Sequence, residues 1–351
     1  MRASINGAVK RCLAACMLCL SLAINPAIAE VPGTEGITKI FSLPGRIAAY
    51  DEARGALRFF SRKGDLLVES GESKRAAAAV WGVTEVPQGL LVATGMGRKS
   101  LTAETVITLF PGSGGSPVEV FKYSGERSQV PFLRYVDGKV WLTYFESKYT
   151  TKTGFLDSKG PAPWMFTEVG TFRLGDVTDV AGECVVVGRP YGDLQGQDGD
   201  LTMIKNGERS PLPSYRGVRA ATFFGRKDDP QIAIGDGWHQ NYGSLAQGRV
   251  SVLRRDTASG RYALQLIEND RDQYGYSKLI SVTKSGKSYL VGLGNKAVVL
   301  FGPEPEWRRT VAHQFVSTET ITDLALVEQD ENGAWIAIVD GGLRLVHIPL
   351  S

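Results

Sequence analysis

The chain has 351 residues, of which 43% are apolar, 22% are charged and 41 are glycine. This composition belongs to a folded protein that can bury a sizeable core, and it excludes a disordered or collagen-like chain. The glycine content is well above the usual ~7% and indicates a chain that turns back on itself often.

The first 29 residues have the three parts of a secretory signal peptide. A basic start precedes an apolar run from Cys12 to Ile24, and Ala27-Ile28-Ala29 forms an A-x-A cleavage site. The apolar run of about 13 residues is too short for a transmembrane helix, which needs ~20. We therefore expect cleavage after Ala29 and a periplasmic or secreted protein that starts at Glu30. The alternative is a lipoprotein signal with Leu13-Ala14-Ala15-Cys16 as its lipobox, but this box would leave almost no apolar stretch before Cys16.

Cleavage would change the charge and the cysteine content of the chain. The segment 1–29 holds three basic residues and no acidic residue, so the formal net charge of +3 falls to zero in the remainder. A neutral chain without a Lys/Arg-rich run lacks the electrostatic footprint of a nucleic-acid-binding protein. Cys184 is the one cysteine left, and its apolar neighbours predict a small core residue. We expect a monomer without an internal disulfide.

One unit recurs along the chain: a short apolar strand that often ends in glycine, a loop, and a second apolar strand. Its copies begin at residues 47, 90, 140, 184, 232, 289 and 335. The spacing of about 48 residues is that of a four-stranded propeller blade. An inner strand precedes each pair, as at 219–224 and 322–327, and an outer strand follows, as at 118–123 and 262–267. These repeats predict an all-β fold, a seven-bladed β-propeller of mostly four-stranded antiparallel blades, with residues 30–351 in one domain.

We expect the last blade to have only three strands. Leu343 to Ile348 reads as its third strand, and only Pro349-Leu350-Ser351 follow. Residues 30–36 are available as a fourth strand, but Pro32, Gly33 and Gly36 predict poor pairing.

The segment Val185-Val186-Val187-Gly188-Arg189-Pro190-Tyr191-Gly192 resembles the strand and turn of FG-GAP repeats, the blades of integrin-α-type propellers and of many exported bacterial proteins. Phe224-Gly225 and Phe301-Gly302 are similar to the Phe-Gly half of the motif. Membership of this family implies a propeller whose blades often carry an Asp-rich calcium loop. The segments Asp198-Gly199-Asp200, Lys227-Asp228-Asp229-Pro230 and Asp330-Glu331-Asn332-Gly333 each lack the full ligand set, so we interpret them as turns and expect no cofactor, with calcium binding as the alternative.

The loops that join the second and third strands of all blades emerge on one face of a propeller. They are short at Asp51 to Gly55, 294–296 and 340–342, and long in the middle four blades, at 95–105, 146–154, 189–200 and 236–248. Long ordered loops in a compact domain are usually functional. We therefore expect the long loops to wall one sector of the channel mouth and to bind a partner protein or a glycan.

The loop of the fifth repeat is the richest in side chains suited to recognition, because aromatic and polar groups cluster there. The binding candidates are Trp238, His239, Asp236, Asn241 and Tyr242 of this loop, Arg189, Tyr191 and Asp193 of the loop before it, and Tyr149 of the loop before that. An alternative is that Trp238 packs on its neighbour and His239 is simply hydrogen-bonded.

The sequence favours a non-catalytic function. It contains no G-x-S-x-G, no H-E-x-x-H and no phosphate-binding P-loop. His313 and His347 lie in expected strands, so a three-His metal site with His239 is not expected. The alternative is a propeller enzyme acting on carbohydrate, a lyase, dehydratase or glycosidase, that uses residues around His239.

Overall fold

The computed structural model describes residues 28–350 apart from residues 72 and 77 and the segments 98–102, 148–149, 179–182, 188–200, 206–207, 215–217, 227–228, 238–247, 257, 271–274 and 317–321. The side chains of residues 183–187, 229, 237 and 270 also lie outside the description, and Cys184 is among them. All regular elements of the described residues are β-strands, which confirms the expected all-β fold.

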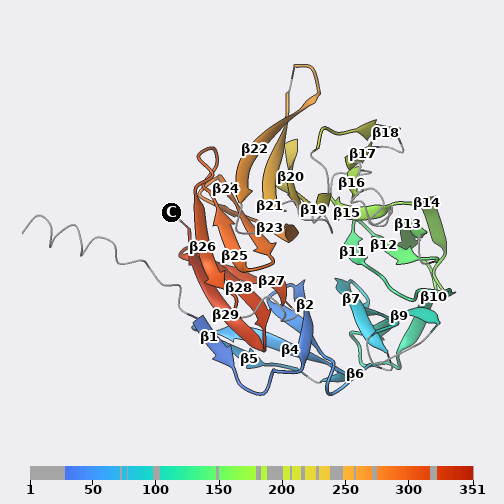
Figure 1. Ribbon diagram of the computed structural model, residues 1–351. Coiled ribbons are helices and arrows are strands. Elements are labelled where there is room, and N and C mark those ends of the chain that lie inside the picture. Colours follow the sequence, from blue (N-terminus) through green and yellow to red (C-terminus); the bar gives the residue numbers. More distant parts are fainter. Residues whose placement is uncertain are drawn as a thin grey trace, which may run out of the picture.

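The strands form antiparallel sheets of consecutive strands that follow one another around a ring (Figure 1). The first sheet comprises β2 (Ile37–Leu43), β3 (Arg46–Asp51), β4 (Ala56–Lys63), β5 (Leu66–Glu69) and β6 (Lys74–Arg75). The next three sheets are β7 (Ala79–Val86), β8 (Gly89–Gly95), β9 (Glu104–Pro111) and β10 (Val118–Ser124); β11 (Phe132–Val136), β12 (Lys139–Phe145), β13 (Thr151–Asp157) and β14 (Phe166–Gly170); and β15 (Arg173–Val177), β16 (Glu183–Val187), β17 (Leu201–Lys205) and β18 (Glu208–Pro211). The last three are β19 (Val218–Arg226), β20 (Asp229–Gly237), β21 (Gly248–Arg255) and β22 (Tyr262–Asp270); β23 (Tyr276–Lys284), β24 (Lys287–Gly294), β25 (Ala297–Phe301) and β26 (Arg309–Gln314); and β27 (Thr322–Gln329), β28 (Gly333–Asp340) and β29 (Leu343–Pro349) with β1 (Ile28–Val31).

The expected architecture of seven blades, the last one three-stranded, needs correction. The structure has six regular four-stranded antiparallel blades, and the sheet β2–β6 differs from them because β6 pairs with β4 as a fifth strand. The last blade is not three-stranded, since β1 pairs with β29 through Ile28↔Val346 to Val31↔Leu343. The number of strands in this blade could not be predicted from local sequence, because β1 and β29 are far apart in the chain. The closing strand also overlaps the expected cleavage site after Ala29.

The first strand of each sheet is its inner strand and faces the centre of the ring. Every inner strand contacts the inner strands of both neighbouring sheets, and β27 contacts β2 to complete the circle. Thr34 supports this closure, because its hydroxyl accepts a hydrogen bond from the N–H of Leu343 at 2.8 Å. The wall of the central channel therefore consists of the inner strands, one from each sheet, and only the contact of β27 with β2 joins sheets that are far apart in the sequence.

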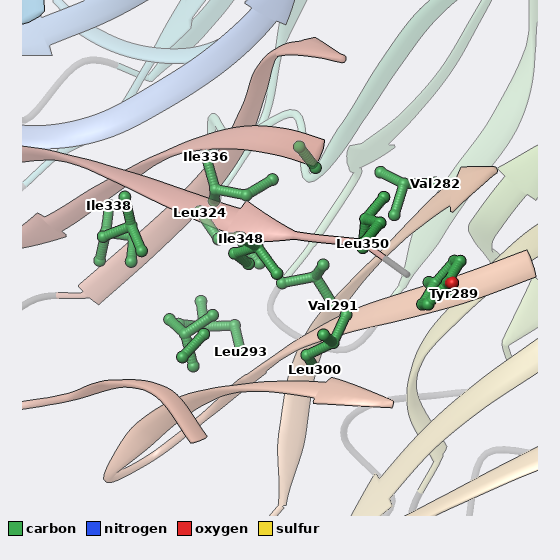
Figure 2. Close-up of a cluster of buried hydrophobic side chains, with 14 of the residues drawn as sticks. Val282, Tyr289, Val291, Leu293, Leu300, Leu324, Ile336, Ile338, Ile348 and Leu350 are labelled. Atoms are coloured by element: carbon green, nitrogen blue, oxygen red, sulfur yellow. The ribbon is translucent and has the colours of Figure 1, made fainter. Parts of the chain in front are cut away.

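Apolar side chains fill the space between neighbouring sheets. Figure 2 shows one such cluster, in which Val291, Leu293 and Leu300 of β24 and β25 face Ile336, Ile338 and Ile348 of β28 and β29. Each of these side chains except Leu300, which is 9% exposed, is at most 3% exposed. The second strands β24 and β28 are thus buried on both faces, as the repeated apolar strands predict.

Glycines near the ends of two second strands make room for an inner-strand side chain. A Cβ atom at Gly235 would lie 2.9 Å from the Cβ and carbonyl oxygen of Tyr276, and one at Gly292 would lie 2.8 Å from the Cδ1 of the same residue. Tyr276 is fully buried between these two second strands. The glycine that recurs in the sequence repeat is therefore needed where a large inner-strand side chain packs closely against the second strand.

Candidate functional site

Most of the binding residues expected from the sequence lie outside the described residues. These are Trp238, His239, Asn241, Tyr242, Arg189, Tyr191, Asp193 and Tyr149. The described strands nearest to them in the sequence are β16, which ends at Val187, and β20, which ends at Gly237. The connection between β12 and β13 is shorter than expected, since β13 already begins at Thr151.

Asp236 is the one candidate whose side chain is described, and it is buried. It lies near the end of β20, its side chain is 1% exposed, and its Oδ1 accepts a hydrogen bond from the Nε of Arg249 at 2.8 Å. Burial raises the pKa of the Asp236 carboxyl to about 6, although the bond from Arg249 acts in the opposite direction. Its Oδ2 has no hydrogen-bond donor among the described residues.

Two other sheets have a buried aspartate at the corresponding place. Asp51 ends β3 and binds Arg58 of β4, with 3.2 Å between the Oδ2 of Asp51 and the Nη1 of Arg58. Asp340 ends β28, and its Oδ2 lies 2.9 Å from the Nε2 of His313 in the outer strand of the preceding sheet. We therefore interpret Asp236 as a residue that holds the end of a second strand and the start of the loop after it.

Five of the seven inner strands contain a β-bulge near their first residues. The bulged residues are Thr38, Trp81, Gly175, Arg219 and Ser277. A bulge inserts one extra residue and re-aims the side chains beside it. Asp176 and Lys278 directly follow a bulge, and together with Arg219 they line the channel. At each bulge the alternation of side chains along the inner strand shifts by one residue, and polar side chains such as those of Asp176 and Lys278 then face the channel.

The channel contains two cavities that meet at a shared waist. We call the first the loop-face cavity: its volume is about 350 Å³, and Arg173 and Ser277 line it. Arg173 pairs with Val187, the last residue of β16, so this cavity opens on the face that carries the loops after the second strands. The second, which we call the opposite cavity, has a volume of about 720 Å³. Asp137 and Arg226, which lie beside the starts of second strands, line it.

The waist residues are held by ion pairs that cross from sheet to sheet. Arg134 of β11 pairs with Asp176 of β15. The carboxylate of Asp176 also accepts hydrogen bonds from the N–H of Val177 at 2.8 Å, the hydroxyl of Thr222 at 3.0 Å and the N–H of Phe223 at 2.8 Å. Asp176 thus joins three consecutive inner strands.

A second bridge of the same kind lies on the other side of the waist. Lys278 of β23 pairs with Asp323 of β27 at 2.9 Å, and Asp323 accepts hydrogen bonds from the N–H groups of Ile40 at 2.9 Å and Leu324 at 2.8 Å. Sequence reasoning missed these residues. Their sequence signal was present, since a charged residue interrupts each apolar inner strand.

The loop-face cavity is strongly basic. Arg134, Arg173, Arg219 and Lys278 line it, and Asp176 is the one acidic residue of its lining. The side chain of Arg134 is 51% exposed and that of Lys278 is 40% exposed, so both remain accessible while paired. This arrangement suits an anionic group that enters from the loop face.

Lys39 of β2 and Trp81 of β7 form a further pair between neighbouring inner strands. The ammonium group of Lys39 lies 3.1 Å from the centroid of the Trp81 ring, and the indole N–H donates to the carbonyl of Met96 at 2.6 Å. Burial lowers the pKa of Lys39 to about 8, and the nearby charges of Asp323 and Glu52 limit the shift.

The described residues contain no group of three or more His, Cys, Asp or Glu side chains that could hold a metal ion. The loop Asp330-Glu331-Asn332-Gly333 is a turn, as interpreted from the sequence: the Oδ1 of Asp330 accepts from the N–H groups of Asn332 at 2.8 Å and Gly333 at 3.1 Å. The loops at 198–200 and 227–228 lie outside the described residues. In the part of the chain that is described, no helix is long and apolar enough to cross a membrane.

Comparison with known proteins supports the fold and nothing finer. No family model matches the chain, so the resemblance to FG-GAP repeats has no support at that level, and no curated protein matches it. Many solved structures are similar to this chain, among them the following three. Sqt1 of Saccharomyces cerevisiae is 11% identical with a TM-score of 0.54, and the alignment covers 93% of this chain and 99% of that one. The β-propeller domain of Cps50 (Swd1) of Myceliophteria thermophila is 9% identical with a TM-score of 0.57, covering 92% and 99%. Hsv2 of Kluyveromyces lactis is 11% identical with a TM-score of 0.53, covering 87% and 90%. These similarities show that the chain is a β-propeller.

Proposed function

We propose that this protein is an exported, non-catalytic propeller that binds an acidic segment of a partner protein at the loop-face cavity. The observation that carries the proposal is the excess of basic side chains there: four cationic residues against Asp176 in the lining of a 350 Å³ cavity. Asp176 accepts four hydrogen bonds within the protein, so its carboxylate has little acceptor capacity left for a ligand.

Rigid inner strands position these cations, and the connections at 188–200 and 238–247 start on the same face. Binding residues commonly gather in loops around such a rigid scaffold. The candidates Trp238, His239 and Tyr242 would then flank the segment that enters the cavity. Export through the signal at residues 1–29 is part of the proposal, and it would place the partner in the periplasm or outside the cell.

The test uses a labelled hexaglutamate peptide as the probe and fluorescence anisotropy as the measurement. Arg219→Ala should weaken binding about two- to fivefold, because an exposed charge pair contributes up to ~1 kcal/mol. The matched control is Arg226→Ala, at the other end of the same strand β19, which lines only the opposite cavity. Raising the salt concentration should weaken binding of the wild type, since screening reduces attraction between exposed charges.

Equal binding of an uncharged hexaserine peptide would contradict the proposal. So would an equal effect of the two arginine substitutions. Binding of a neutral oligosaccharide that resists salt and depends on Trp238 would instead favour a glycan as the ligand.

A further inference from the structure

The opposite cavity differs from the loop-face cavity in the chemistry of its walls. Tyr135 of β11, Phe223 of β19, Ile280 of β23 and Leu326 of β27 line it, and each of them is only half-buried. Its volume of about 720 Å³ lies within the range of ~300–1,000 Å³ that is typical of small-molecule sites. Apolar side chains from four inner strands thus surround a space large enough for a ligand.

The inner end of this cavity offers hydrogen-bond donors. Arg134 carries five N–H donors and Lys278 three. Their contacts among the described residues are the single ion pairs with Asp176 and Asp323. Both side chains are about half exposed, so several donors of each remain available to a ligand.

Most acceptor sites at the same place are already occupied by hydrogen bonds within the protein. A carboxylate has about four acceptor sites. The carboxylate of Asp176 accepts four hydrogen bonds, from Arg134, Val177, Thr222 and Phe223. The carboxylate of Asp323 accepts three. The waist therefore presents unused donors, and a group that only accepts hydrogen bonds fits it best.

We propose that the opposite cavity binds a small amphiphilic carboxylic acid. The carboxylate lies at the waist against Arg134 and Lys278, and the apolar body lies against Phe223, Ile280 and Leu326. A charged head alone would leave the apolar walls in water, and an alkyl chain alone would leave the donors without an anion. The carboxylate shares Arg134 and Lys278 with the partner segment proposed at the loop face, whereas the apolar body lies only in the opposite cavity.

The probes are hexanoate, octanoate and decanoate, each used below its micelle concentration, with binding measured by isothermal titration calorimetry. Burying one CH₂ group should tighten binding about fourfold, the factor that corresponds to ~0.8 kcal/mol. Affinity should therefore rise about fourfold per carbon through the series. 1-Octanol has the same chain without the charge and should bind at least tenfold more weakly than octanoate.

Two serines provide matched variants. Ser42 lines only the opposite cavity and Ser277 only the loop-face cavity, and both are exposed on inner strands. Ser42→Trp should abolish octanoate binding while hexaglutamate still binds. Ser277→Trp should leave octanoate binding unchanged and block hexaglutamate. Circular dichroism verifies folding, and Ser281→Phe, also in the opposite cavity, replaces Ser42→Trp if that variant fails to fold.

Lys278→Met tests the head group, since methionine keeps much of the length of the side chain and removes its charge. It should reduce the preference for octanoate over octanol, since only Arg134 then faces the carboxylate. The proposal is overturned if octanol binds as tightly as octanoate in the wild type, if affinity does not depend on chain length, or if Ser277→Trp abolishes octanoate binding and Ser42→Trp does not. Loss of hexaglutamate binding alone would count only against the function proposed for the loop face.

Discussion

The buried carboxyl of Asp236 should make folding stability depend on pH, and Asp236→Asn should remove that dependence. Its side chain is 1% exposed, and burial raises its pKa from 3.8 to about 6. The folded state therefore holds the proton more tightly than the unfolded state does. It follows that the contribution of this group to stability is full below pH 3.8, and that it is lost as the pH rises through about 6.

The size of the change in folding stability with pH follows from the pKa shift of Asp236. Two pKa units correspond to about 3 kcal/mol, of which about 2.5 kcal/mol should be lost between pH 4 and pH 7.5. An asparagine at position 236 does not ionise, and its side-chain oxygen can still accept the bond from Arg249. The free energy of unfolding of Asp236→Asn, relative to that of the wild type, should therefore rise by about 2.5 kcal/mol over this range.

Urea unfolding at half-unit steps of pH measures this difference, and comparing two proteins cancels the titration of all other groups. Asp256→Asn is the control with the opposite sign, because hydrogen bonds from the hydroxyl of Ser259 and the N–H of Ala258 lower the pKa of Asp256. A difference between Asp236→Asn and wild type that stays constant from pH 4 to pH 7.5 would refute the reasoning. A decrease with pH would show that Arg249 outweighs burial.

Four further results are expected. His313→Ala should lower the free energy of unfolding by about 3 kcal/mol or more in urea titrations, because it leaves the carboxylate of Asp340 buried without its partner; a loss below about 1 kcal/mol would mean that water or another donor takes over. Thr34→Val should cost about 1–3 kcal/mol by the same assay, since the N–H of Leu343 loses its acceptor where the chain closes on itself; an unchanged midpoint would show that this closure adds little stability. Intact-mass analysis of the exported protein should give a chain that begins at Glu30 without a lipid, and a lipidated Cys16 would disprove this. Adding EDTA should leave Tm unchanged if the Asp-poor loops are ordinary turns, whereas a fall that calcium reverses would restore the integrin-like interpretation.

The positions of the strands could be predicted from the sequence because they depend on local pattern. Apolar residues at 232–235, 289–292 and 335–339 mark strands that are buried on both faces, and the structure places β20, β24 and β28 there. The glycines at 235 and 292 were visible as a repeated signal, and the structure shows that they admit Tyr276. The buried aspartates also had a signal, since Asp51, Asp236 and Asp340 all end or nearly end a second strand.

Contacts between distant segments required the tertiary structure. The pairing of Ile28–Val31 with β29 joins the two ends of the chain, and Pro32 and Gly33 beside it argued locally against a strand. Arg134 and Asp176 are 42 residues apart and meet because their inner strands are neighbours in the ring. The strands and the β-propeller class could be predicted without the structure, since both follow from hydrophobic periodicity. The closure of the ring and the two chemically different cavities depend on side chains that only the ring brings together.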